Sequence, residues 1–167
     1  KLTLGTSDES ETGKLIIDGT TANVSSTRLV DNKDKATFVL GKNATLQNAK
    51  SNQWGAALIN RGTGVAKLYG SIKNNECTGA GGAILQHGTG TTTIYEGNYT
   101  NNKATRKAAG TTTASYGGFL RVDAGTVEIK GGTFSDNQTV GLGGLLWLDA
   151  DATVVLSGGT YENNTAA

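Results

Sequence analysis

The chain has 167 residues, and its 15 Lys and Arg against 14 Asp and Glu give a formal net charge of +1. This balance gives no electrostatic reason to expect nucleic acid, an anionic membrane or an acidic substrate as partner. Glycine supplies 25 residues and proline none, which favours tight turns between short strands over a proline-rich disordered segment. No apolar run approaches the roughly 20 residues of a membrane span, and the single cysteine, Cys77, excludes an internal disulfide.

The first 45 residues carry weak repeat signals. Short apolar or β-branched runs bounded by glycine or aspartate predict strands within 2–5, 15–19 and 37–41. Because terminal coils of repeat proteins are often atypical, we expect irregular coils over 1–45 and regular coils over 46–167 of one continuous domain. The sequence contains no methionine, so we also expect Lys1 to be a processed end of a longer chain.

Three motifs recur after residue 45 with a common period of about 26 residues. The first is an aromatic or aliphatic residue followed three positions later by asparagine, and it begins at Ile72, Tyr99, Phe134 and Tyr161. The second is a glycine pair before two apolar residues, and it begins at Gly81, Gly117 and Gly143, with a degenerate copy at Gly55. The third is a β-rich run, and it begins at Val65, Thr91, Thr126 and Thr153. All three lengthen in the same copy, so 103–115 is predicted to be a surface insertion.

Short strands at this period predict an all-β protein, a right-handed parallel β-helix of about six coils. Each coil has three short strands and three turns. Successive coils stack at roughly 4.8 Å, so strands pair between coils rather than within one.

In-register coils would bring four asparagines of the first motif into one column: Asn75, Asn102, Asn137 and Asn164. A side-chain amide both donates and accepts hydrogen bonds, so each can bond to its neighbours above and below. We interpret this column as a structural asparagine ladder.

Alternation along the strand after each glycine pair predicts which side chains point inward. With Leu58, Ile84, Leu120 and Leu146 inward, the flanking positions point outward. The apolar residues at these outward positions are Ile59, Leu85, Phe119, Leu145 and Trp147. An exposed apolar cluster suggests a binding face, unless the insertion or a flanking segment covers it.

The next outward column contains His87, Asp123 and Asp149. Stacked carboxylates are weak candidates for holding Ca²⁺, or for acid–base chemistry on a polysaccharide. The sequences Asp-Ala-Gly and Asp-Ala-Asp are more typical of turns, so we expect no metal, no cofactor and no catalytic residue here. His87, the only histidine, cannot form a multi-histidine metal site and is expected to be a turn or surface residue.

The Gly-Gly-Ala-Ile motif at 81–84 alternates with Phe-x-x-Asn motifs such as 134–137. This alternation resembles the repeats of polymorphic outer-membrane proteins. It is also similar to right-handed β-helix repeats of large bacterial surface proteins and autotransporter passengers. The resemblance covers 46–164 and implies an extracellular, adhesin-like rod without catalytic residues.

We therefore expect an extracellular or cell-surface module, structural and adhesive, from a surface or filament-forming protein. Its expected partners are a host or neighbouring-cell protein or glycan, or identical subunits joined end to end. The alternative is a polysaccharide lyase or hydrolase built on the same scaffold. Glycosylation sequons occur at Asn23, Asn43, Asn98, Asn137 and Asn163, and they matter only in a glycosylating secretory pathway.

Overall fold

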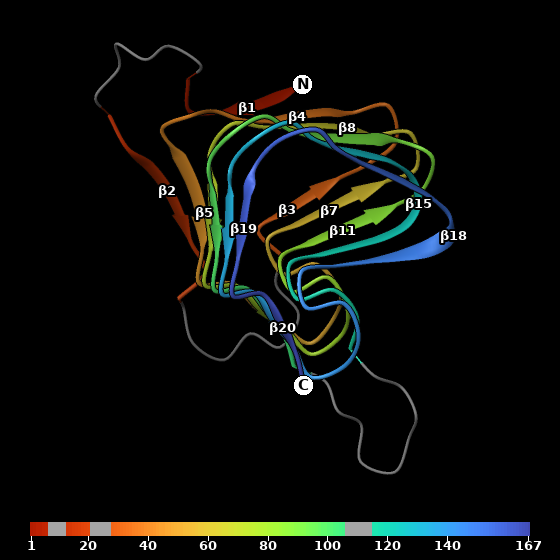
Figure 1. Cartoon of the computed structure of the whole chain (residues 1–167). Coiled ribbons are helices and arrows are strands. Elements are labelled where there is room, and N and C mark those ends of the chain that lie inside the picture. The colour runs from red at the N-terminus through yellow and green to blue at the C-terminus, as the bar shows by residue number, and fades with distance from the viewer. Residues whose placement is uncertain (7–12, 21–27, 106–114) are drawn as a thin grey trace.

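The computed structural model describes residues 1–6, 13–20, 28–105 and 115–167, which contain strands and turns but no helix (Figure 1). The chain winds around a common axis, and each segment pairs in parallel with the matching segment of the next turn. The protein is therefore an all-β parallel β-helix. One sheet has five strands, one from each of about five turns, compared with the six predicted.

A partial turn precedes the full ones. It contributes β1 (Leu2–Leu4) and β2 (Leu15–Asp18), which pair with strands of the first full turn. That turn comprises β3 (Val30–Asn32), β4 (Thr37–Leu40), β5 (Ala44–Gln47) and β6 (Lys50–Ser51).

The remaining turns repeat this order. The second comprises β7 (Leu58–Arg61), β8 (Val65–Leu68), β9 (Ser71–Lys73) and β10 (Glu76–Cys77). The third comprises β11 (Ile84–His87), β12 (Thr91–Ile94), β13 (Asn98–Thr100) and β14 (Lys103–Ala104). The fourth comprises β15 (Leu120–Ile129), β16 (Thr133–Ser135) and β17 (Gln138–Thr139). The fifth comprises β18 (Leu146–Leu156), β19 (Thr160–Glu162) and β20 (Thr165–Ala166).

The first three full turns have four strands each, rather than the three predicted, because a short turn divides the longest side of the coil. In the third turn, Gly88 to Gly90 separate β11 from β12. In the fourth turn, the shorter link Ala124-Gly125 lets one strand, β15, pair with both β11 and β12. The register between β15 and β18 shifts at this point.

Matching residues of successive turns pair as the 26-residue period predicts. Leu58, Ile84, Leu120 and Leu146 are neighbours in this order along one sheet. The first three are fully buried and belong to the continuous apolar core. Aromatic rings stack in the same way, with centroids 4.8 Å apart for Tyr99 and Phe134. Burial of these columns supplies the main driving force for winding.

The predicted insertion, 103–115, begins within a regular strand. Lys103 and Ala104 form β14, which pairs with β10 on one side and β17 on the other. Residues 106–114 lie outside the described residues. Ser115 is buried, and the following Tyr116 bridges to Leu142 of the next turn.

Hydrogen bonds connect the four asparagines of the predicted ladder in sequence. Nδ2 of each donates to Oδ1 of the next, at 3.0 Å for Asn75 to Asn102, 3.0 Å for Asn102 to Asn137 and 2.8 Å for Asn137 to Asn164. Each accepting oxygen also takes the backbone N–H of the preceding asparagine at 3.1 Å. The left-handed backbone conformation belongs to the residue before each of them, as at Asn101, where φ is 53°.

A second amide column lies inside the β-helix. Asn32 Nδ2 donates to Asn60 Oδ1 at 2.7 Å, and Asn60 Nδ2 donates to Gln86 Oε1 at 2.9 Å. Gln86 Oε1 also accepts from the Thr92 hydroxyl at 2.7 Å. These polar groups are buried but satisfied, so they stabilise the register instead of weakening the core.

Candidate functional site

The predicted apolar face is not an exposed surface. Phe119 is fully buried, and its ring packs against Tyr99 and Phe134 in the core. Leu145 is half-buried and packs against the same core. Both residues lie in the corner between the glycine pair and the strand, where strand alternation does not yet apply. The assignment of Phe119 and Leu145 to an outer face is therefore wrong.

Ile59 and Leu85 lie on strands beside inward residues but outside the core cluster, and both are nevertheless buried. Together they line a hollow of about 190 Å³ with the flanking residues Arg28, Gln53, Trp54, Arg61 and His87. One expectation is that a flanking segment covers these apolar residues, and Gln53 and Trp54 of such a segment lie beside them in the lining of this hollow. Trp147 is half-buried at the neighbouring edge.

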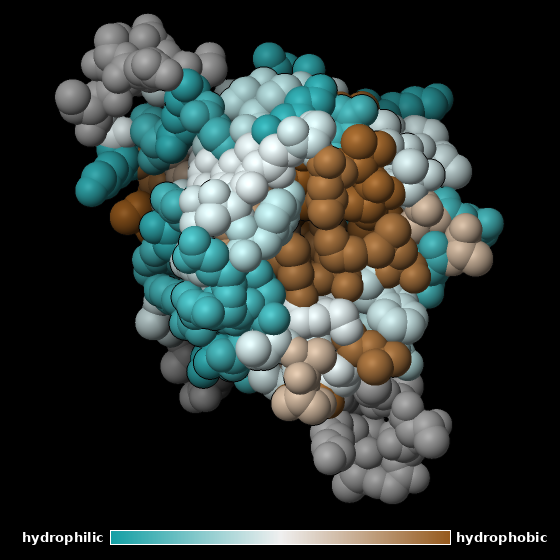
Figure 2. Space-filling view, viewed as in Figure 1, coloured by the Kyte–Doolittle hydropathy of each residue, from teal (hydrophilic) through white to brown (hydrophobic). Residues whose placement is uncertain are grey.

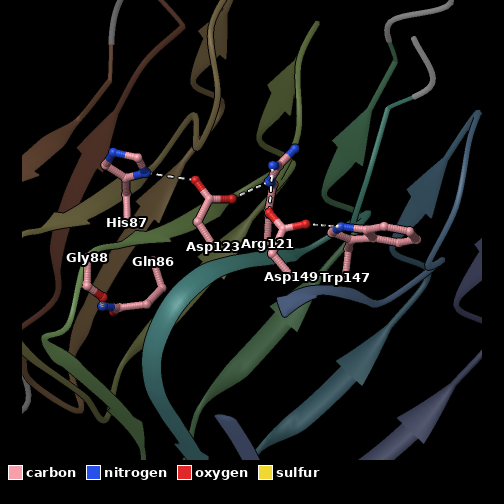
Figure 3. Close-up of polar contacts among 7 residues, drawn as sticks. All are labelled: Gln86, His87, Gly88, Arg121, Asp123, Trp147 and Asp149. Carbon is pink, nitrogen blue, oxygen red and sulfur yellow. Dashed lines mark hydrogen bonds and ion pairs between the residues drawn. The ribbon is translucent and has the colours of Figure 1, made fainter. Parts of the chain in front are cut away.

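The charged residues on this side form a continuous network across three turns (Figure 3). Arg121 forms an ion pair with Asp123 through Nε, and its Nη2 donates to Asp149 Oδ2 at 2.8 Å. His87 Nδ1 lies 2.7 Å from the other oxygen of Asp123. Trp147 Nε1 donates to Asp149 Oδ1 at 3.2 Å. All four oxygens of the two predicted carboxylates therefore have partners.

Aromatic rings frame the Arg121 guanidinium. Its Cζ lies 4.8 Å from the Trp54 ring centroid and 5.5 Å from that of Tyr116. Tyr116 in turn packs against Trp147 with centroids 4.6 Å apart. Cation–π contacts of this kind stabilise by about 0.5–2 kcal/mol, depending on desolvation. We call Trp54, His87, Tyr116, Arg121, Asp123, Trp147 and Asp149 the ion–aromatic cluster.

Sequence reasoning missed Trp54 and Tyr116, although a signal was present. Each directly precedes the first glycine of a glycine-pair motif, at Gly55 and Gly117. The repeat therefore places both residues in one column of the solenoid, together with Ala80 and Leu142. Aromatic residues two turns apart in such a column can be bridged by a long side chain from a neighbouring strand, as Arg121 does.

The environment of Asp149 keeps its side chain charged. Partial burial raises the pKa of Asp149, but the hydrogen bond from Trp147 and the charge of Arg121 outweigh this effect and hold it below its ordinary value. A carboxyl group with a lowered pKa is a poor general acid at neutral pH. Arg121 also lies between the two carboxylates, where it supplies the positive charge that a bound cation would otherwise provide.

The other singled-out residues offer little reactive chemistry. Burial raises the pKa of Cys77 to about 12, so this thiol is a poor nucleophile at neutral pH. Within the described ranges, no group of three or more His, Cys, Asp and Glu residues could hold a metal ion. Of the sequon asparagines, Asn137 is fully buried in the ladder, and Asn23 lies outside the described residues.

None of the described segments forms a helix with the length and apolar character that crossing a membrane requires. Comparisons of the chain with protein-family models, with curated proteins and with solved structures found no match.

Proposed function

We propose that the protein is an extracellular structural and adhesive module of a surface or filament-forming protein, and that it is not an enzyme. The parallel β-helix is the scaffold, and the ion–aromatic cluster is the contact surface for a partner protein or glycan. The supporting observation is that side chains from distant parts of the sequence are fixed in one network on the outer side of the coils.

The composition of the cluster favours binding. Trp, Tyr and Arg are the residues that most often carry binding energy at protein interfaces. Here their side chains are already held by hydrogen bonds and ring contacts. Such preorganisation lowers the conformational entropy lost on association.

The paired state of the carboxylates argues for a binding role rather than the alternative of a polysaccharide lyase or hydrolase. Asp123 and Asp149 both interact with Arg121, and neither carboxylate has an oxygen without a partner. We expect no cleavage of uronate or neutral polysaccharides, with or without Ca²⁺. Cleavage of any of these polysaccharides would contradict this assignment if the substitutions Asp123→Asn and Asp149→Asn abolished it.

The adhesive role can be tested on arrayed glycans, immobilised matrix proteins and whole cells. Trp147→Ala should weaken binding by about tenfold, because it removes an aromatic anchor worth more than 1 kcal/mol. The matched control is Tyr95→Ala, which removes an aromatic ring stacked on Tyr69 outside the cluster. If Trp147→Ala folds normally and binds as well as the unmodified chain, the cluster is not the contact surface.

A further inference from the structure

The hollow beside the ion–aromatic cluster has a distinct chemistry. Its volume, about 190 Å³, lies below the roughly 300 Å³ at which pockets for larger ligands begin, so it has room for about one sugar-sized ring. Its apolar lining comes from Ile59 and Leu85. Trp54, 41% exposed, supplies an aromatic wall.

The charged groups that line this hollow are the guanidinium groups of two arginines. Arg28, Arg61 and His87 line it, and none of the described lining residues is acidic. The two arginines line the same hollow, where burial and the charge of Arg61 lower the pKa of Arg28 from its ordinary value and Asp31 opposes this effect. Asp31 Oδ1 pairs with Arg61 Nε at 3.1 Å. A second anion would relieve the remaining repulsion.

Trp54 is fixed in place from several sides. Arg28 Nε donates to the Trp54 carbonyl oxygen at 2.9 Å, and Arg28 Nη2 donates to Gln53 Oε1 at 2.8 Å. Arg121 stacks on the indole ring but does not line the hollow, so it supports Trp54 from outside. The ring also occupies the space that a Cβ at Gly79 would need.

We propose that this hollow binds the charged ring of an acidic sugar, a pyranose that carries a carboxylate or sulfate group. The ring packs against the exposed Trp54, above the buried floor of Ile59 and Leu85, and the anionic group pairs with Arg28 and Arg61. This inference rests on the proposed adhesive function and specifies its ligand class. Carboxylate and sulfate are distinguished by the experiment.

The test is an NMR titration of the indole N–H signals of the whole chain, which has two tryptophans. Methyl glucuronide and glucose 6-sulfate are the charged probes, methyl glucoside is the neutral ring, and sodium acetate is the anion without a ring. We expect at least one charged sugar to shift the Trp54 signal with tenfold or greater preference over methyl glucoside and acetate. The stronger of the two charged sugars identifies the anionic group.

Two variants separate the charge from the aromatic wall. Arg61→Gln should weaken charged-sugar binding about tenfold, as expected for the loss of a charge-assisted hydrogen bond. Gly79→Ala should also weaken binding, because the new methyl group displaces Trp54 while every charge stays in place. The matched control Lys67→Gln removes an exposed positive charge on β8 outside this hollow and should leave binding unchanged.

Equal binding of methyl glucoside, or tighter binding of a poly-glutamate peptide, would overturn the inference. So would a silent Trp54 signal with every sugar. If adhesion still depends on Trp147 in that case, the inference alone has failed. If charged sugars bind but Trp147→Ala leaves adhesion intact, the cluster has failed as the contact surface instead.

Discussion

At the scale of single residues, amides hold the register of the coils. The side-chain oxygen of Asn102, Oδ1, accepts two hydrogen bonds from Asn75. The side-chain nitrogen of Asn102, Nδ2, donates to Ile72 O and to Asn137 Oδ1. Its side chain is fully buried, so water cannot replace these partners. Each ladder asparagine therefore satisfies polar groups in the neighbouring turns as well as its own.

Asn102→Leu should lower the free energy of unfolding by about 2–4 kcal/mol, because it leaves the buried backbone N–H of Asn75 without its acceptor and removes one of the acceptors of Asn75 Nδ2. Urea denaturation followed by circular dichroism measures this loss. The control is Asn101→Gly, an exposed neighbour whose φ of 53° suits glycine, with an expected change within about 0.5 kcal/mol. Equal effects of the two substitutions would argue against the ladder as a stabilising element.

Asp149 links stability to pH. Its pKa in the folded protein lies below the ordinary 3.8, so the unfolded chain takes up a proton first as the pH falls. Its contribution to stability is complete above about pH 5, from its ordinary pKa, and is lost as the pH falls through the folded pKa. The melting temperature of Asp149→Asn should therefore lie below that of the unmodified protein at pH 7, and the difference should shrink as the pH is lowered below about 5. A constant difference across this range would contradict the role of the charge.

At the scale of elements, the glycine pair sets the corner before each main strand. The first glycine has a positive φ, 64° at Gly81 and 67° at Gly117, and a Cβ there would collide with the carbonyl group of the residue three positions later. Gly81→Ala should destabilise the protein by roughly 1–3 kcal/mol through this strain. Gly13→Ala, where a Cβ meets nothing within 4 Å, is the control for thermal melting. Similar melting temperatures for both variants would show that the corner adapts without cost.

The elements also show where sequence reasoning succeeds. A fixed period predicts which residues stack, so the sheets and the asparagine column follow from spacing alone. Strand alternation predicts direction only inside a strand, and for this reason it failed at Phe119, one residue before β15 begins. The ion–aromatic cluster depends on long side chains that cross between columns, such as Arg121 reaching Trp54, and a period does not specify how far they reach.

At the scale of the whole molecule, the fifth turn presents the interior of the β-helix. Val122 and Ile129 of β15 are fully buried, but their neighbours on β18, Leu148 and Leu156, are 38% and 52% exposed. Figure 2 shows apolar residues gathered at the centre of this end, in the same view as Figure 1. An apolar surface next to strands that have no partner on their outer side among the described residues favours association.

The end-to-end joining of identical subunits that we expect from the sequence would make this surface an interface. We expect the chain to associate with increasing concentration in sedimentation velocity, and the double variant Leu148→Glu with Leu156→Glu to remain monomeric. The control is Val155→Glu, which adds one of these negative charges to the same strand, at a residue that is 46% exposed but paired with the outward Glu128. Because this side chain does not belong to the end surface, Val155→Glu should associate like the unmodified chain. A monodisperse monomer at all concentrations, or equal loss of association in the control, would contradict stacking through β18.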